Sequence, residues 1–259
     1  MEFEFFSITD TGRSRSNNED SIAVDEKNRL VVLADGMGGY NAGEVASSMA
    51  TSILVGDLGR WLSEAAASAT DGEVRRAMTL CVDNVNQAIF SSANTDARHA
   101  GMGTTLVTGV FRDARLLLGH IGDSRAYRLR DGTLRQITRD HSLLQEQIDA
   151  GLITAEQAAS AANKNLVTRA VGVESEVQLE LHGHDVLAGD VYLFCSDGLT
   201  DMVDRPLIER LLKDGDSLQA SGQALLAAAN AAGGRDNISV ILVRASAATS
   251  ARPWWQFRR

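Results

Sequence analysis

Short apolar runs bounded by polar or glycine-containing turns recur along this 259-residue chain and predict β-strands. The runs cover residues 3–9, 21–25, 30–34, 104–111, 115–121, 126–130, 177–182, 191–195 and 238–244. After the run at 126–130, the Asp131-Gly132 pair predicts a two-residue hairpin turn, because this dipeptide accepts the backbone angles that tight hairpins require.

A different hydrophobic spacing indicates helices at 43–62, 73–91 and 217–232. In the second of these, Val74, Met78, Cys81 and Val85 follow the 3.6-residue helical period. Gly233 and Gly234 are expected to end the third helix. The segment 142–166 is helix-prone but poor in large apolar residues. We therefore expect it to be an inserted, mobile flap between two parts of the core.

Strands and helices occur in blocks and do not alternate strictly, which favours an α+β layered fold with antiparallel sheets over a doubly wound parallel sheet. We expect one domain over residues 1–245 and a short tail over 246–259. The tail ends in PWWQFRR. We interpret it as a terminal segment that folds onto the domain or lacks fixed structure, the alternative being contact with a partner or a membrane interface.

Composition narrows the classes of function. The formal net charge of −9 argues against a nucleic-acid or anionic-membrane binder, since such proteins show a basic surface. The two cysteines, Cys81 and Cys195, lie in apolar stretches and are expected to be buried free thiols. The N-terminus lacks the features of a signal peptide, and no apolar run approaches the ~20 residues that span a bilayer. We therefore expect a cytoplasmic protein with no transmembrane anchor.

Four aspartates lie where an apolar run meets a glycine-containing turn: Asp35, Asp123, Asp197 and Asp236. A carboxylate at a buried strand end is costly unless a positive group meets it, so the fold is expected to gather these four around one or more cations. Oxygen ligands suit Mg²⁺, Mn²⁺ or Ca²⁺. Two such ions sharing carboxylates bind a water, lower its pKa and neutralise phosphoryl oxygens, which favours phosphoryl chemistry, while structural Ca²⁺ is the non-catalytic alternative.

The N-terminal stretch GRSRSNNEDS adds groups that a phosphoryl-transfer site uses. The guanidinium of Arg15 is suited to binding two phosphate oxygens at once. Glu19 and Asp20 are placed to orient metal-bound waters. The glycines that follow Asp35 allow the backbone to approach a metal closely, and the carbonyl of Gly36 is a candidate ligand.

Taken in order, the motifs of the chain resemble those of the metal-dependent serine/threonine phosphatases, the PPM or protein phosphatase 2C family, and its bacterial branch in particular. They are RSNNEDS, LADGMGG followed by AGEVAS, GMGTTL, GHIGDSRAYRLRDG, TRDHS, TRAVG, CSDGLTDMV and GGRDNISVILV. They extend over about residues 3–244.

The resemblance implies a four-layer α-β-β-α sandwich with two central antiparallel sheets and a flap at 142–166 beside the active site. It also implies two core Mn²⁺ or Mg²⁺ ions and a weaker third ion. Asp35 would bridge the core ions, and the Gly36 carbonyl would bind the second. The other implied ligands are Asp197 and Asp236 on the first ion, and Asp123 with Asp197 on the third.

The implied activity is hydrolysis of phosphoserine and phosphothreonine in proteins by direct attack of a metal-activated water, without a covalent phosphoenzyme. Arg15 would bind the substrate phosphate, while Glu19 and Asp20 would act on coordinated waters. The implied partners are phosphoprotein substrates and a cognate bacterial Ser/Thr kinase, and we expect a monomer. A regulatory phosphatase with one dedicated partner and a catalytically inactive phosphoprotein-binding scaffold are the alternatives, and the second is disfavoured because every metal aspartate is present.

The proton donor to the leaving alcohol is open. Met37 stands where family members from higher organisms carry a histidine after Asp-Gly, and Tyr40 stands where bacterial members often carry one. A metal-bound water is our preferred donor. His120, expected in a strand, and His141, expected in a turn, are interpreted as structural residues.

Overall fold

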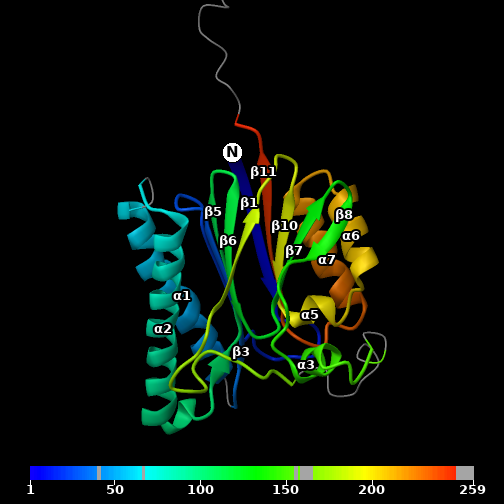
Figure 1. Cartoon of the computed structure of the whole chain (residues 1–259). Coiled ribbons are helices and arrows are strands. Elements are labelled where there is room, and N and C mark those ends of the chain that lie inside the picture. The colour runs from blue at the N-terminus through cyan, green and yellow to red at the C-terminus, as the bar shows by residue number, and fades with distance from the viewer. Residues whose placement is uncertain (40–41, 66–67, 155–156, 158–165, 249–259) are drawn as a thin grey trace, which may run out of the picture.

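The computed structural model describes residues 1–39, 42–65, 68–154, 157 and 166–248, and in these ranges the chain forms two antiparallel sheets enclosed by helices. The two sheets lie face to face, with long helices on the outer side of one and shorter helices on the outer side of the other (Figure 1). The α+β fold with antiparallel sheets in four layers is thus confirmed.

The first sheet joins the two ends of the described chain. Its strand order is β1 (Glu2–Asp10), β11 (Ile238–Ser246), β10 (Val191–Cys195), β7 (Arg125–Arg130) and β8 (Thr133–Gln136). β1 and β11 pair antiparallel along their whole length, from Glu2 opposite Ser246 to Asp10 opposite Ile238. This pairing brings the segment that follows β1 next to the segment that precedes β11.

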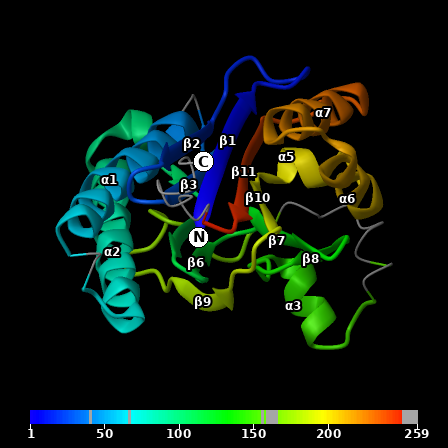
Figure 2. The same cartoon turned by 90° about the horizontal axis from the view of Figure 1, so that it is seen from above.

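The second sheet contains β2 (Asp20–Asp25), β3 (Leu30–Met37), β5 (Leu106–Arg112), β6 (Arg115–Ile121) and β9 (Glu180–Asp185) in that order, and the short β4 (Gly103–Thr104) pairs with β3. β8 and β9 are therefore edge strands, one in each sheet. Seen from above, they lie on the same side of the sandwich (Figure 2).

Helices α1 (Ala42–Ala65) and α2 (Asp71–Thr95) cover the second sheet. Helices α5 (Asp197–Thr200), α6 (Arg205–Asp214) and α7 (Leu218–Ala231) cover the first. Helix α2 begins with a capping box, in which Thr70 Oγ1 accepts from the Glu73 amide and the Glu73 carboxylate accepts from the Thr70 amide. Helix α3 (Leu143–Asp149) lies within the predicted flap segment.

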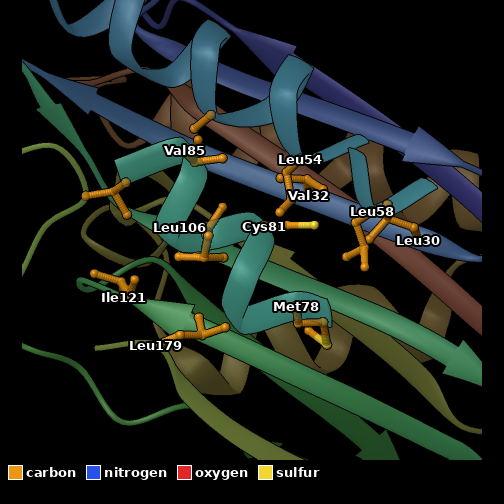
Figure 3. Packing of buried hydrophobic residues seen from close by; sticks show 14 of the residues in the cluster. Leu30, Val32, Leu54, Leu58, Met78, Cys81, Val85, Leu106, Ile121 and Leu179 are labelled. Carbon is orange, nitrogen blue, oxygen red and sulfur yellow. The ribbon is translucent and has the colours of Figure 1, made fainter. Parts of the chain in front are cut away.

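Three buried clusters fill the spaces between the four layers. Side chains alternate between the two faces of β3: Leu30 and Val32 pack toward α1 and α2, whereas Val31 and Leu33 face the other sheet. Figure 3 shows Leu54 and Leu58 of α1 meeting Leu30 and Val32. Between the sheets, Phe111 forms edge-on contacts with Tyr192 and Phe194, with ring centroids 5.2 and 6.3 Å apart.

Most predicted elements occur within a few residues of their expected bounds. The Asp131-Gly132 turn is confirmed, with φ of 49° and 73°, and joins β7 to β8. β9 begins at Glu180, three residues later than expected. Helices α5 and α6 were not predicted, because four and ten residues are too few for a helical period to stand out beside the neighbouring strand pattern.

The expectation of buried free thiols is confirmed. Cys81 and Cys195 are free and buried, and burial raises the pKa of their thiols to about 11 and about 12. Among the described helices, none combines the length and the apolar character needed to cross a bilayer. The PWWQFRR tail, Tyr40 and most of residues 155–165 lie outside the described residues.

Candidate metal centre

A cavity of about 220 Å³ lies where β3 and the turns next to β6, β10 and β11 converge. Apart from Asp20, every residue proposed from the sequence for this site lines it: Arg15, Glu19, Asp35, Gly36, Asp123, Asp197 and Asp236. Residues from both sheets and from opposite ends of the chain therefore meet at one place.

Asp35 is fixed by the strands on either side of β3. Its amide donates to Thr105 Oγ1 at 3.0 Å, and its carbonyl oxygen accepts from the Thr105 amide at 2.8 Å. Across the β2–β3 pair, Asp20 is directly opposite Asp35. The Asp20 carboxylate is buried behind the cavity, where its Oδ2 accepts from Ser196 Oγ at 2.8 Å and its Oδ1 has no hydrogen-bond partner among the described residues.

Asp197 opens helix α5 directly after β10, and close packing holds it against the start of β11. A Cβ atom on the next residue, Gly198, would lie 1.9 Å from the carbonyl oxygen of Asn237, so only glycine allows this approach. Asn237 in turn accepts from the Glu19 amide at 2.8 Å and donates to the carbonyl oxygens of Thr11 and Asn17. Its side chain joins the N-terminal loop to the carboxyl-terminal part of the site.

Asp123 follows β6 through a tight turn at Gly122, whose φ is +97°. A Cβ at Gly122 would lie 2.8 Å from Thr105, the residue that also anchors Asp35. The Gly122 amide donates to His141 Nδ1 at 3.1 Å, and the Gly122 carbonyl accepts from the His141 amide at 2.9 Å. The turn that presents Asp123 is thus held from two sides.

Arg15 reaches the site from the N-terminal loop and forms an ion pair with Asp236, with Nη2 and Oδ2 2.7 Å apart. About half of the Arg15 side chain remains exposed to solvent, so it is accessible to an incoming anion. Asp236 is oriented by the amide of Asn237, which donates to its Oδ1 at 2.8 Å.

Gly36 lies against the first turn of α1. A Cβ at Gly36 would be 2.1 Å from the Gly43 carbonyl oxygen and 2.6 Å from that of Glu19. A Cβ at Gly43 would be 2.6 Å from the Glu19 carboxylate. Strand β3, the Glu19 loop and helix α1 therefore meet through two glycines, and the Glu19 carboxylate lies beside the start of α1.

The electrostatics of the cavity favour a bound cation. Burial, followed by the charges of neighbouring aspartates, raises the pKa of Asp35 and of Asp197 well above the ordinary value. Burial also raises the pKa of Asp20 and of Asp123 to about 6. The donor set consists of carboxylates with a backbone carbonyl beside them, which fits Mg²⁺ or Mn²⁺, and the lining residues include no histidine or cysteine, the usual Zn²⁺ ligands.

Some residues of the site were not singled out from the sequence, although the quoted motifs contain them. Thr105, Ser196 and Asn237 position the aspartates through hydrogen bonds, and Asp201 adds a negative charge that raises the pKa of Asp197 and Asp123. His120 and His141 do not line the cavity. His120 Nε2 lies 2.8 Å from the Arg139 carbonyl oxygen, and His141 Nε2 lies 3.0 Å from Glu180 Oε2, as structural residues would.

Comparison with known proteins identifies the family to which this architecture belongs. The profile of the family described as Protein phosphatase 2C matches residues 10–242. The chain belongs to the protein phosphatase 2C family. It is similar to the serine/threonine phosphatase stp of Listeria innocua, with 39% identity over 238 residues that cover 91% of this chain and 93% of the relative.

Solved structures of bacterial members of the protein phosphatase 2C family agree. The Mycobacterium tuberculosis serine/threonine phosphatase PstP/Ppp superimposes with a TM-score of 0.86 at 37% identity, covering 95% of this chain and 100% of that one. The PstP catalytic domain in complex with two manganese ions gives a TM-score of 0.81 at 37% identity, covering 95% and 99%. The chain is thus a bacterial, metal-dependent serine/threonine phosphatase of the PPM family.

Proposed function

We propose that this phosphatase removes phosphate from phosphoserine and phosphothreonine in proteins by direct attack of a water molecule on phosphorus. The observation that carries the proposal is the convergence of four aspartates and one accessible arginine on a single cavity. Two divalent ions held there would supply a water of lowered pKa and neutralise the phosphoryl oxygens. The two Mn²⁺ ions of the PstP complex support this reading for the present chain.

Each residue has a proposed task. Asp35 would bridge the two core ions, the Gly36 carbonyl would bind the second, and Asp197 and Asp236 would bind the first. Arg15 binds the substrate phosphate, a task that its fork of donors suits. Glu19 and Asp20 act behind these ligands: Glu19 is oriented by Asn237, and Asp20 is buried against Asp35 and Ser196.

A weaker third ion is proposed between Asp123 and Asp197. In support, the Asp123 charge is the second contribution, after burial, that raises the pKa of Asp197. For proton donation to the departing alcohol we propose a coordinated water. Met37 lines the cavity at the position where a histidine would offer a proton, and neither His120 nor His141 lines the cavity.

The wider setting is also part of the proposal. We propose a monomeric cytoplasmic enzyme whose catalytic domain covers residues 1–245, with the flap at 142–166 beside the cavity, and which reverses a bacterial Ser/Thr kinase. Supporting the flap assignment, Val167 lines the cavity and pairs with Ser142 at the base of the segment.

Hydrolysis of a phosphothreonine peptide with Mn²⁺ tests the proposal. Activity is expected to vanish with EDTA and to fall by orders of magnitude in Asp35→Ala and Asp197→Ala. Asp83→Ala, which removes an exposed carboxylate on α2, is the matched control and should retain full activity. Unchanged turnover in either cavity variant would refute the metal-water mechanism.

The third ion needs its own variant. Asp123→Ala is expected to impair turnover while two ions remain bound, as measured by metal content after dialysis. Full activity in Asp123→Ala would remove the role proposed for the third ion.

A further inference from the structure

A second cavity, of about 380 Å³, opens at the edge of the sandwich between the two sheets. We call it the β8–β9 groove. The residues that line it include Arg128, Arg135, Arg139, Glu180, His182 and His184. It shares no lining residue with the metal cavity.

The alternation of side chains between the two faces of a strand explains why these side chains meet. Ala126 of β7 faces the other sheet, so Arg128, two residues on, has the same direction. In β9, Leu181 packs toward α1 and α2, which places His182 and His184 on the inner face. The apolar layer between the sheets therefore gives way to arginine and histidine side chains at this edge, where β8 and β9 lie on the same side of the sandwich (Figure 2).

The two strand arginines form an unusual pair. Arg128 of β7 and Arg135 of β8 are directly opposite each other in the antiparallel ladder. Like charges in this arrangement repel unless an anion lies between or above them. Within the described residues, neither guanidinium has an ion pair or a side-chain hydrogen bond, whereas Arg139 is paired with Asp149 of α3.

Buried polar atoms without partners concentrate here. Two buried side-chain atoms of the groove, Arg128 Nε and His184 Nε2, lack a hydrogen-bond partner among the described residues. A third, His120 Nδ1, lies next to it, since the His120 ring stacks near that of His182. Leaving buried polar groups unpaired is costly, so a ligand that accepts hydrogen bonds would be favoured.

The electrostatic field in the groove is positive, although the whole chain has a formal net charge of −9. The pKa of His184 is lowered, first by burial and then by electrostatic interaction with His182 and with the arginines Arg128, Arg115 and Arg135. Glu180 is the only carboxylate among the lining residues, and it already accepts from His182 and is paired with His141. At Arg128 and Arg135 an anionic ligand would meet guanidinium groups that have no competing acceptor among the described residues.

From this geometry we infer that the β8–β9 groove is a second anion site, which takes a phosphoryl oxyanion between the Arg128 and Arg135 guanidinium groups and the His182 and His184 rings. Guanidinium forks match tetrahedral oxyanions bidentately, and the volume admits a phosphate group with part of the molecule that carries it. Two sources share this chemistry: free inorganic phosphate and a second phosphorylated residue of a protein substrate.

Histidine-ring NMR on the Mg²⁺-loaded, full-length enzyme tests the inference by titration with inorganic phosphate at constant ionic strength. The ring signals of His182 and His184 are expected to shift saturably, with a dissociation constant in the millimolar range or below, while those of His99 stay in place. Arg135→Gln, which alters an exposed side chain, should weaken this binding at least about fivefold, corresponding to about 1 kcal/mol. Arg76→Gln on the exposed face of α2 is the matched control and should leave it unchanged.

Absence of a saturable shift at His182 and His184, or equal binding in Arg135→Gln and the native protein, would overturn the inference. Arg128→Gln provides a second variant for the same comparison. This binding measurement needs no turnover, so its failure is distinguishable from failure of the proposed activity.

The source of the anion is decided by comparing singly and doubly phosphorylated peptides, an arm that rests on the proposed function. A lower KM for the doubly phosphorylated peptide that is lost in Arg135→Gln assigns the groove to the substrate. Equal KM values together with phosphate binding assign it to free phosphate, and both results support the anion site.

Discussion

Asp35 is surrounded by other carboxylates. It is directly opposite Asp20 across β2 and β3, and the charges of Asp20, Asp197, Asp123 and Asp236 all raise its pKa in addition to burial. Such a residue opposes folding in the absence of cations and favours binding of cations when they are present. The same property thus links stability, metal affinity and pH at one position.

Replacing Asp35 by asparagine is expected to stabilise the metal-free chain and to destabilise the Mn²⁺-loaded one. The pKa of folded Asp35 lies above that of the unfolded chain, so the metal-free protein loses stability as pH rises through this range. In EDTA at pH 8, thermal unfolding of Asp35→Asn should therefore occur above that of the native chain, by about 2–4 °C for each kcal/mol gained.

The sign of the pH effect provides the control. Because the pKa of Asp35 is higher in the folded chain than in the unfolded one, lowering the pH protonates native Asp35 first, so the stability difference between Asp35→Asn and the native chain in EDTA should shrink toward acid pH. A difference that grows toward acid pH would show that repulsion at Asp35 is not the cause.

Arg15 is expected to act on substrate binding through the shape of its guanidinium as well as its charge. Arg15→Lys keeps the charge but loses the bidentate fork, so we predict a KM for a phosphothreonine peptide raised about tenfold, or about 1.4 kcal/mol, with a larger increase in Arg15→Ala. Steady-state kinetics at saturating Mn²⁺ measure this, with Arg76→Lys as the control. A native KM in Arg15→Ala would exclude Arg15 from phosphate binding.

The unit formed by β10, α5 and the start of β11 is the element that sets the distance between Asp197 and Asp236. This unit allows little displacement of α5, because Gly198 lies against the Asn237 carbonyl and Ser196 Oγ accepts from the Ser239 amide at 3.0 Å. Four residues of helix are too short to be stable alone, so this packing determines where Asp197 points.

Gly198→Ala is predicted to displace α5 from β11 and to reduce both stability and Mn²⁺ affinity. A Cβ 1.9 Å from a backbone oxygen forces a shift, and overpacking of this kind costs about 1–3 kcal/mol. Thermal unfolding and calorimetric Mn²⁺ titration measure the two effects. Gly56→Ala in α1, where the added Cβ meets nothing within 4 Å, is the control and should be neutral or stabilising. Native Mn²⁺ affinity in Gly198→Ala would contradict this account of α5.

Sequence patterns predicted the strands, because their apolar runs are conspicuous. They also predicted that the four aspartates would gather at one site, because each aspartate ends one of these runs. They did not identify Asn237 or Ser196, whose partners are far away in the chain: Asn237 binds Glu19 and Thr11, and Ser196 binds Asp20. Contacts between the chain's ends leave no local periodicity. The same holds for the β8–β9 groove, which exists only because two edge strands lie on one side of the sandwich.

At the scale of the whole molecule, the pairing of β1 with β11 makes the site possible. It places the loop that carries Arg15 and Glu19 beside the turn that carries Asp236, while β3 contributes Asp35 from the second sheet. Three apolar layers hold the two sheets and their helices in fixed relation. The candidate metal centre is therefore a property of the complete sandwich and is not contained in any one motif.

The measurement that tests this most directly is anomalous diffraction at the manganese edge from crystals of the Mn²⁺-loaded protein. The account predicts two strong peaks in the 220 Å³ cavity, bridged by Asp35, with Asp197 and Asp236 on one ion and the Gly36 carbonyl on the other. A weaker third peak is expected between Asp123 and Asp197. Manganese found only outside this cavity, or two ions that share no Asp35 carboxylate, would contradict the account.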